Sequence, residues 1–332
     1  MSEYSWAAPK DAAMREAMEQ LAPRRIKERL AADVKAFRDR TAEAENSGDA
    51  SARASALVSL GRAYARAADL PAAFNASTEA RVTATGSGDK RLLAAATAQE
   101  AVVLTRQGSD GAQQAFHAAS KTASDLSATD LVIALQVDLA SLQLARGDVN
   151  SALAQLDDAF ALGRTQQDTW GKGLALACAG CAYALTRSFA EASALLARAQ
   201  LLHERAQDVL SLARTYNNQG VIHMLAGRFV DAIPYVDRSL ELLTDQPDLL
   251  MVLNVLNNMI RISELQSLER AGALRDQMLA LVDLLPDRAL ARCADMTMPS
   301  LEPNSPFGSS ATFSDDPVVA GPFLLLPVVV AD

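Results

Sequence analysis

Aspartate recurs along this chain at a nearly constant spacing, and this recurrence restricts the folds that the chain can adopt. The spacing stays between 38 and 41 residues, and each aspartate lies at or beside a short polar break followed by apolar residues of helical period. Aspartate is a favourable N-cap, because its carboxylate accepts hydrogen bonds from free N–H groups of the first helical turn. A period of this length predicts an architecture of stacked helical units. The series is Asp49, Asp89, Asp130, Asp168, Asp208, Asp248 and Asp287.

A second break near the middle of each unit divides it into two helices. These breaks fall at 67–69, 108–110, 147–148, 187–188 and 227–228. A further helical stretch over about 11–47, interrupted at Pro23, precedes the first pair. We number the six pairs as units one to six. The expected helices are 50–66 and 70–85, 89–107 and 110–126, 130–146 and 149–165, 169–186 and 189–206, 208–226 and 229–245, and 249–265 and 267–284.

Three units share a motif of small and aromatic residues. In each of them a glycine in the first helix stands twelve residues before an alanine in the second, where the two helices have to approach closely. The motif residues are Leu57, Leu60, Gly61, Tyr64 and Ala73 in unit one, Leu176, Ala179, Gly180, Tyr183 and Ala192 in unit four, and Tyr216, Gln219, Gly220 and Ala232 in unit five.

This motif resembles that of the tetratricopeptide repeat (TPR) family. The period of about 40 residues resembles its long-repeat subfamily, such as kinesin light chains or bacterial peptide-sensing regulators. Units two and six match less well, because Ala101 and Ile260 occupy the glycine position. The resemblance implies an all-α fold, a right-handed superhelical solenoid of about six antiparallel helix pairs. One such pair cannot bury its apolar face alone, so neighbouring units are expected to stack.

The expected domain organisation has three parts. Residues 1–48 form an N-terminal helical extension, residues 49–298 form the TPR-like solenoid, and residues 299–332 form a Pro/Ser-rich disordered tail with an apolar end. The apolar end, 318–330, is shorter than a membrane-spanning helix. It is an unstructured terminus, a segment that docks on the solenoid, or a tag for a membrane or a partner; a truncated or frame-shifted gene end is also consistent with it.

Charge and cysteine content restrict the partners and the compartment. The formal net charge of −9 and the pI near 5.0 oppose direct nucleic-acid binding. The densest basic group, at 24–29, has acidic neighbours and is interpreted as a solvated helix face: Arg24, Arg25, Lys27 and Arg29. The polar residues Lys10 and Asp11 interrupt the apolar stretch that a secretion signal needs, and three cysteines make no disulfide framework. We therefore expect a cytoplasmic protein without a membrane span.

The residues that could carry chemistry do not form a recognisable catalytic site. Cys178 and Cys181 have the spacing of redox and zinc sites but lie in the middle of a helix among Ala and Leu, so packing is their expected role. His117, His203 and His223 are isolated from any catalytic partner in the sequence. The sequence thus predicts no enzyme activity, no catalytic residues, no cofactor and no metal site.

Polar side chains in units five and six are the candidate peptide-binding residues. By the family resemblance, positions two, five and nine of the repeat motif, which lies within each first helix, face the concave groove. These positions hold Arg214, Asn217 and Val221 in unit five, and Asn254, Asn257 and Arg261 in unit six. Asparagine amides can pair with a peptide backbone and arginine with a carboxylate. The alternatives are that these asparagines are solvated surface residues or form hydrogen bonds between repeats.

The same positions in units two to four are small or apolar. They predict a groove floor that suits an amphipathic helix or an apolar segment. They are Ala95, Ala98, Val102, Ala134, Val137, Ser141, Leu174, Ala177 and Cys181.

Two functions from different classes fit this sequence. The first is a protein- or peptide-binding scaffold or adaptor, which self-association through the apolar groove or tail could accompany. The second is a sensory or regulatory TPR module of a bacterial signalling protein, such as a diguanylate cyclase or a transcription regulator, whose output domain is missing or separate. No output-domain motif is visible after residue 285, so the scaffold is the leading hypothesis.

Overall fold

The computed structural model describes residues 9–107, 109, 111–266, 268 and 270–285, and this part of the chain is all-helical. The observed helix ends lie within a few residues of those expected from the sequence. The tail at 299–332 and Asp287 lie outside the described residues. The helices are α1 (Pro9–Gln20), α2 (Pro23–Ser47), α3 (Ala50–Arg66), α4 (Leu70–Ser87), α5 (Lys90–Arg106), α6 (Gly111–Asp125), α7 (Thr129–Ala145), α8 (Val149–Thr165), α9 (Thr169–Leu185), α10 (Phe189–Ala206), α11 (Val209–Leu225), α12 (Phe229–Leu242), α13 (Leu249–Leu265) and α14 (Arg270–Val282).

Aspartate caps begin many of these helices, as the spacing predicts. The carboxylate of each cap accepts a hydrogen bond from the backbone N–H three residues later, which satisfies one of the free donors of the first turn. Two members of the predicted series differ. Asp130 lies inside the first turn of α7, whose N-cap is Ala128, and Asp168 occupies the N-cap of α9 without making this hydrogen bond. The capping residues are Asp49, Asp69, Asp89, Asp148, Asp208 and Asp248.

The glycine–alanine pairs of the motif mark the closest approach of the two helices in a unit. A Cβ added to Gly61 would lie 3.4 Å from the carbonyl oxygen of Ala73. The corresponding distance is 3.3 Å from Gly180 to Ala192 and also from Gly220 to Ala232. A larger residue at these glycines would push the two helices apart, which confirms the expectation from the motif.

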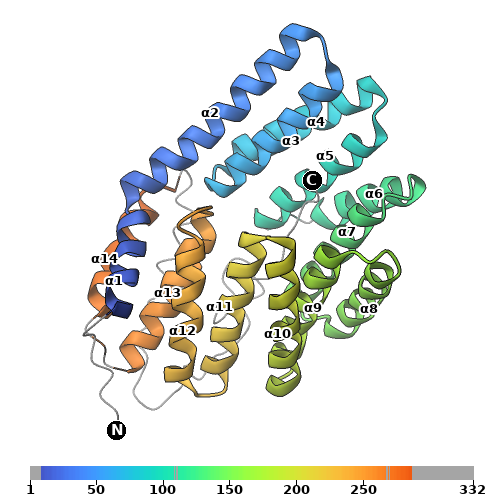
Figure 1. Ribbon diagram of the computed structural model, residues 1–332. Coiled ribbons are helices and arrows are strands. Elements are labelled where there is room, and N and C mark those ends of the chain that lie inside the picture. The colour runs from blue at the N-terminus through green and yellow to red at the C-terminus, as the bar shows by residue number, and fades with distance from the viewer. Residues whose placement is uncertain (1–8, 108, 110, 267, 269, 286–332) are drawn as a thin grey trace.

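A repeated core lies between the helices. The second helices α8, α10 and α12 bury a small residue and, four positions later, a larger one: Ala152 and Leu156, Ala192 and Leu196, Ala232 and Val236. The first helices of neighbouring units also contact one another, and they form the inner layer of the array in Figure 1. No helix of the described chain combines the length and the apolar character that crossing a bilayer requires.

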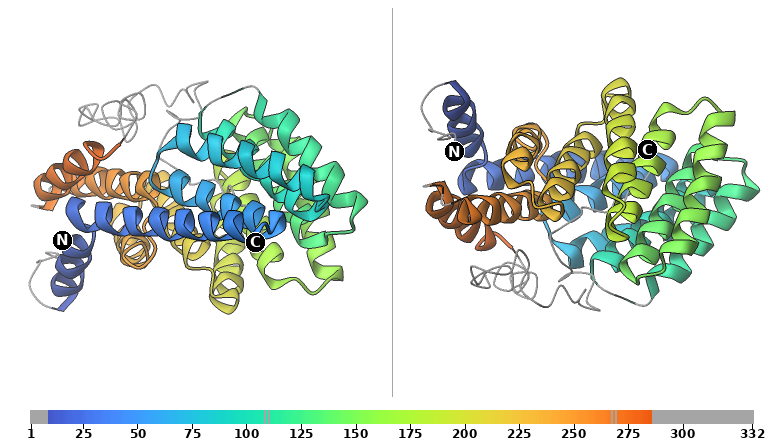
Figure 2. Two further views of the ribbon diagram at one scale, coloured as in Figure 1. Left: turned by 90° about the horizontal axis from the view of Figure 1, so that it is seen from above. Right: turned by 90° about the horizontal axis from the view of Figure 1, so that it is seen from below.

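The array curves until its two ends meet, which the sequence did not predict. Helix α1 contacts α12, and α2 contacts α14; Figures 1 and 2 show these N-terminal helices beside the C-terminal ones. The side-chain amide of Gln277 in α14 donates to the carbonyl oxygens of Met18 and Leu21, at 3.1 and 2.9 Å. Arg29 of α2 donates to the carbonyl oxygen of Thr244. The N-terminal extension therefore links the last unit to the first.

The basic group at the start of α2 is only partly the solvated face that the sequence predicts. Arg24, Arg25 and Lys27 are exposed, and Arg24 pairs with Glu28 one turn later. Arg29 is instead half-buried in the contact with Thr244 and also donates to Gln20 at 3.0 Å. One residue of this group thus helps to join the two ends.

Candidate peptide-binding site

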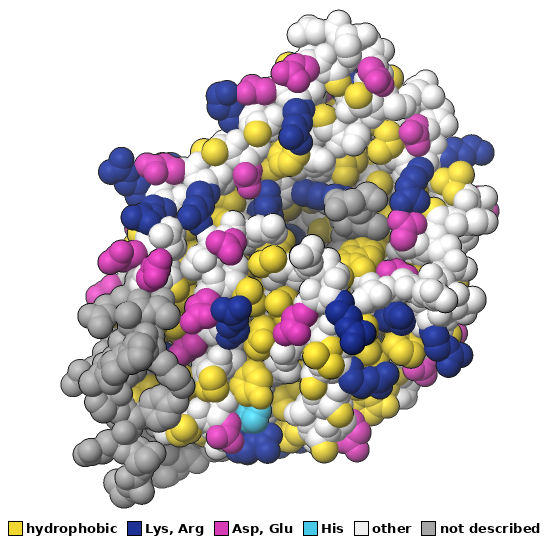
Figure 3. Space-filling model, viewed as in Figure 1, with side chains coloured by type: hydrophobic (Ala, Val, Ile, Leu, Met, Phe, Trp, Pro, Cys, Tyr) yellow, Lys and Arg dark blue, Asp and Glu magenta, His cyan; other side chains and the backbone are white. Residues whose placement is uncertain are grey.

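The predicted groove residues lie in α11 and α13, two of the first helices that form the inner layer of the array in Figure 1. Asn254, Asn257 and Arg261 are spaced at i, i+3 and i+7, which places them on one side of α13. Arg214 and Asn217 occupy the matching side of α11. Figure 3 shows a hollow near the middle of the molecule, with Lys and Arg side chains at its edge.

Asn217 is buried and takes part in hydrogen bonds between repeats. Its Nδ2 donates to Oδ1 of the neighbouring Asn218 at 3.2 Å, and its Oδ1 accepts from Nδ2 of Asn258 in α13 at 2.9 Å. Asn218 in turn donates to Sγ of Cys181 in α9 at 3.2 Å. This network joins the first helices of units four, five and six, so the inter-repeat alternative describes the contacts of Asn217 in this structure.

Asn257 occupies the equivalent position in α13 but has different surroundings. The residue is 3% exposed, and its Nδ2 is buried with no hydrogen-bond partner. Leaving a buried amide donor unpaired costs about 1–3 kcal/mol. Asn254, one turn earlier on the same side of α13, is half-buried. Asn257 therefore holds a donor that an acceptor on a ligand could satisfy.

Arg214 and Arg261 add positive charge on the same faces. Both side chains are half-buried, and neither forms an ion pair or a hydrogen bond with another described residue. Burial lowers the pKa of both guanidinium groups; for Arg214 the nearby carboxylates of Asp208 and Asp248 oppose this shift. A desolvated cation without a direct partner is energetically costly and favours an anionic ligand.

The small residues of units two to four form an inner face that is apolar, as predicted, but buried in the structure. None of the nine groove positions in these units is more than 9% exposed, and Val221 of unit five is also fully buried. Arg214, Asn254 and Arg261, which are half-buried, are therefore the more accessible part of the predicted groove.

The two cysteines of the Cys-x-x-Cys spacing are packing residues in this structure. Both are fully buried, and burial raises the pKa of Cys178 to about 12 and also raises that of Cys181. Sγ of Cys178 lies 3.4 Å from the hydroxyl of Ser141. Such thiols remain protonated and unreactive at neutral pH. No group of three His, Cys, Asp or Glu side chains in the described chain is arranged to hold a metal ion.

The three histidines have different environments. His117 is exposed, and His223 stacks on Tyr235 with a ring-centroid distance of 5.0 Å. His203 is fully buried, and both of its ring nitrogens lack a hydrogen-bond partner. Burial lowers its pKa to about 4, so its imidazole is neutral at neutral pH. Its ring fills the space left by Gly173, where an added Cβ would lie 2.9 Å from Cε1.

The prediction from the sequence missed a row of buried, mostly polar residues in the first helices. Each of them directly follows position five of the repeat motif. Gln99, Asp138, Cys178, Asn218 and Asn258 occupy this row at intervals of 39 or 40 residues, and all are buried. Polar residues that recur at one repeat position inside apolar helices were the available signal. They indicate hydrogen bonds between neighbouring units.

Comparison with solved structures finds helical-repeat proteins, and the superposition with one of them, BtubC, agrees with the fold described above. The crystal structure of BtubC (BKLC) from P. vanneervenii superposes with a TM-score of 0.50 and 19% identity, over 64% of this chain and 90% of that chain. Nearly identical TPR-like repeats of a kinesin light chain from Podosopora anserina give a TM-score of 0.41 and 14% identity, over 56% of this chain and 92% of that one.

Comparison at the level of sequence gives no relative. No protein-family model and no curated protein matches this chain. The fold is nevertheless defined by the paired helices, their close glycine–alanine contacts and the superposition with BtubC. The chain is an all-α helical-repeat solenoid of the TPR-like class.

Proposed function

We propose that this protein is a scaffold or adaptor that binds an acidic peptide, or an acidic segment of a partner protein, on the inner faces of α11 and α13. The peptide backbone pairs with Asn257 and Asn254, and carboxylates on the peptide pair with Arg214 and Arg261. Asn217 supports this site from within the inter-repeat network. The site uses binding interactions and no covalent chemistry.

The observation that carries the proposal is the unpaired Nδ2 of Asn257 beside unpaired arginines. A buried amide donor and two desolvated cations all lose free energy in the unliganded protein, and a single acidic peptide would satisfy all three. The nearby carboxylates of Asp208 and Asp248 already act on Arg214, and they limit how many negative charges the ligand can bring close to it.

The test begins with the selection of peptides from a random 12-residue library on the immobilised protein. Selected peptides are then titrated by fluorescence anisotropy against the wild type, Asn257→Ala, Arg261→Gln and the control Arg238→Gln. Arg238 lies on α12, is exposed and pairs with Glu241 at 2.8 Å. We expect enrichment of Asp and Glu and about a tenfold or larger loss of affinity in the two site variants.

The result for the Arg238 control separates this site from general charge attraction. Its affinity should equal that of the wild type, and only the Arg261→Gln variant should lose part of its salt dependence. Equal affinities for all folded variants would place the ligand elsewhere and contradict the proposed function. Enrichment of basic peptides would contradict it as well.

The alternative function is a regulatory TPR module of a bacterial signalling protein. It uses the same inner face to sense a peptide and differs only in the need for an output domain, which is missing from this sequence or lies on a separate chain. The resemblance to peptide-sensing regulators supports this function. The contacts of α1 with α12 and of α2 with α14 support it as well, because a ligand bound on the inner face would be able to change these contacts between the two ends of the solenoid. Either function is expected to operate in the cytoplasm.

A further inference from the structure

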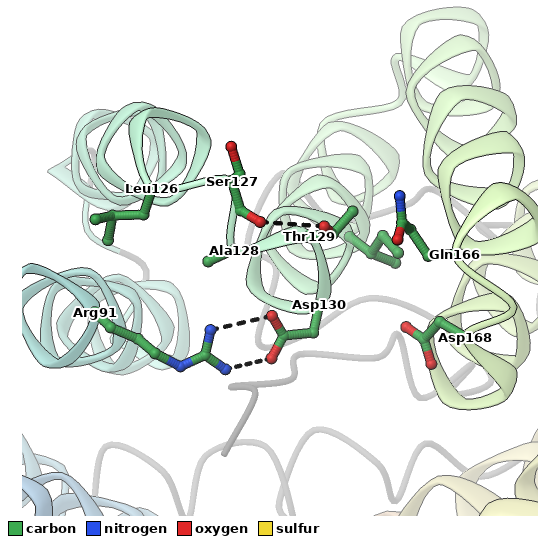
Figure 4. A pocket seen from close by; sticks show the side chains of 9 residues that line it. Arg91, Leu126, Ser127, Ala128, Thr129, Asp130, Gln166 and Asp168 are labelled. Atoms are coloured by element: carbon green, nitrogen blue, oxygen red, sulfur yellow. Dashed lines mark hydrogen bonds and ion pairs between the residues drawn. The ribbon is translucent and has the colours of Figure 1, made fainter.

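A cavity of about 530 Å³ lies at the start of the first helices in units two, three and four. Its volume is in the range of small-molecule pockets, roughly 300–1,000 Å³. Figure 4 shows its two charged sides: Arg91 and Asp130 on one, and Asp168 with Gln166 on the other. The cavity is separate from the peptide site on α11 and α13. Its lining consists of Arg91, Leu126, Ser127, Ala128, Thr129, Asp130, Ile133, Gln166 and Asp168.

Asp168 is the unusual residue in this lining. It occupies the N-cap of α9, but its carboxylate makes no capping hydrogen bond, whereas the six capping aspartates described above all do. Its side chain also has no ion-pair partner among the described residues, and Oδ2 is buried without a hydrogen bond. The cavity thus contains a negative charge that nothing in the described chain neutralises.

Gly171 allows the carboxylate to take this position. A Cβ at residue 171 would lie 2.4 Å from Oδ2 of Asp168 and 2.7 Å from Cγ2 of Ile133. Any other residue at 171 would therefore displace the Asp168 carboxylate or the Ile133 side chain. Glycine at this position leaves room for both the carboxylate and the Ile133 side chain.

On the opposite side of the cavity, Arg91 and Asp130 form an ion pair without net charge. Arg91 donates to both carboxylate oxygens of Asp130, at 3.2 and 2.5 Å, and this contact lowers the pKa of Asp130. Asp130 keeps free lone pairs for a second donor, because a carboxylate can accept about four hydrogen bonds. Two carboxylates and one guanidinium leave the cavity with one net negative charge.

The remaining lining defines the shape of a suitable ligand. Leu126, Ala128 and Ile133 provide apolar surface, and Ser127, Thr129 and Gln166 provide neutral polar groups. A cation at the end of an aliphatic stem matches this combination, since its stem can pack on the apolar residues while its head reaches a carboxylate.

We propose that this cavity binds the ammonium or guanidinium group of an aliphatic cation, with Asp168 as its ion-pair partner and Asp130 as a second acceptor. Two sources have this chemistry: a lysine or arginine side chain of a bound protein, and a free amine such as agmatine. Because the cavity is separate from the inner faces of α11 and α13, this inference does not depend on the proposed peptide site.

The experiment measures the binding of three probes by NMR titration of the full chain. The probes are N-acetyl-arginine amide, its uncharged isostere N-acetyl-citrulline amide, and agmatine. They are added to the wild type, Asp168→Asn, and the control Asp148→Asn, a cap aspartate of α8 that is not part of the cavity lining. Far-UV circular dichroism verifies that each variant is folded; Asp168 makes no capping bond, so its replacement should leave α9 intact.

We expect the cationic probes to bind the wild type and Asp148→Asn equally, and to bind Asp168→Asn about tenfold more weakly. The citrulline probe should bind weakly to all three. Stronger binding of N-acetyl-arginine amide than of agmatine identifies a protein side chain as the ligand, and the reverse identifies a free amine. Absence of binding by both cationic probes, or equal binding by Asp168→Asn, overturns the proposal.

Gly171→Ala provides a second variant that keeps the negative charge. Its Cβ should displace the Asp168 carboxylate, so binding should weaken although the net charge is unchanged. Binding to this variant at the wild-type level, in a folded protein, would also contradict the proposed position of the cation.

Discussion

Arg106 and Asp248 form an ion pair between the second and the last unit of the solenoid. Nη2 of Arg106 lies 3.1 Å from Oδ2 of Asp248, although 142 residues separate them. Nη1 of the same arginine donates to the carbonyl oxygen of Ala65 at 2.9 Å. The side chains of Arg106 and Asp248 are 20% and 8% exposed, so water screens this pair only partly. One guanidinium therefore links units one, two and six.

This pair leads to the first prediction, that replacing Arg106 opens the array. Arg106→Gln leaves the Asp248 carboxylate without its cation, and we expect a loss of about 1–3 kcal/mol in the free energy of unfolding. Small-angle X-ray scattering should show a larger radius of gyration. The control Arg238→Gln breaks an exposed pair and should change stability by less than about 1 kcal/mol. An unchanged radius and stability for Arg106→Gln would show that the ends close without this pair.

The second prediction concerns acid stability and His203. The pKa of this buried histidine is lowered from 6.5 in the unfolded chain to about 4 in the fold, chiefly by burial. Between these values the unfolded chain binds the extra proton, so the free energy of unfolding falls as the pH decreases through this window. The total loss is about 3 kcal/mol, at 1.36 kcal/mol per unit of pKa. Asp208 and Arg214 are the charged groups that act on the ring.

Urea unfolding at pH 7 and pH 4.5 isolates this contribution. The loss of stability between the two pH values should be smaller for His203→Gln than for the wild type, because the variant lacks the titrating group. His117→Gln changes an exposed histidine and should behave as the wild type does. Identical pH dependence in all three proteins would contradict the burial effect.

The third prediction compares a glycine in a crowded site, Gly220, with a glycine that has open space around it, Gly272. A Cβ at Gly220 would lie 2.7 Å from Cγ1 of Val236 and 3.3 Å from the carbonyl oxygen of Ala232, so Gly220→Ala should destabilise the fold by about 1–3 kcal/mol. Gly272 in α14 has nothing within 4 Å of an added Cβ. Gly272→Ala should therefore stabilise the protein by up to about 1 kcal/mol through helix propensity. Thermal unfolding distinguishes the two, and an equal shift in both would argue against close packing at Gly220.

The repeated part of the fold was accessible from the sequence, because it depends on local signals. Capping aspartates and the Gly220–Ala232 spacing act within one unit, and each recurs several times along the chain. Closure of the ends is different, since the contact of Arg106 with Asp248 depends on small rotations summed over several units. No local sequence pattern determines the total rotation between the first and the last unit.

The candidate site was predicted by position but not by environment. Asn217 and Asn257 occupy the same place in successive units, so the repeat pattern assigns them the same role. Their surroundings differ because α13 follows Asn217 and supplies Asn258 as a donor, whereas Asn257 belongs to the last unit and has no following first helix among the described residues. The position of a unit within the array thus determines which amide is paired.

The last prediction separates folding from binding at these two asparagines. Asn217→Ala removes the acceptor of Asn258 and the donor to Asn218, so we expect a loss of about 1–3 kcal/mol in the free energy of unfolding. Asn257→Ala removes a donor that is already unpaired, so the stability should stay the same or rise slightly. Urea unfolding measures both effects, and titration with a selected acidic peptide measures binding. Affinity should fall about tenfold or more for Asn257→Ala, because the peptide carbonyl then lacks its donor. If Asn257→Ala unfolds as readily as Asn217→Ala and binds the peptide as the wild type does, then Asn257 is a structural residue and the peptide site lies elsewhere.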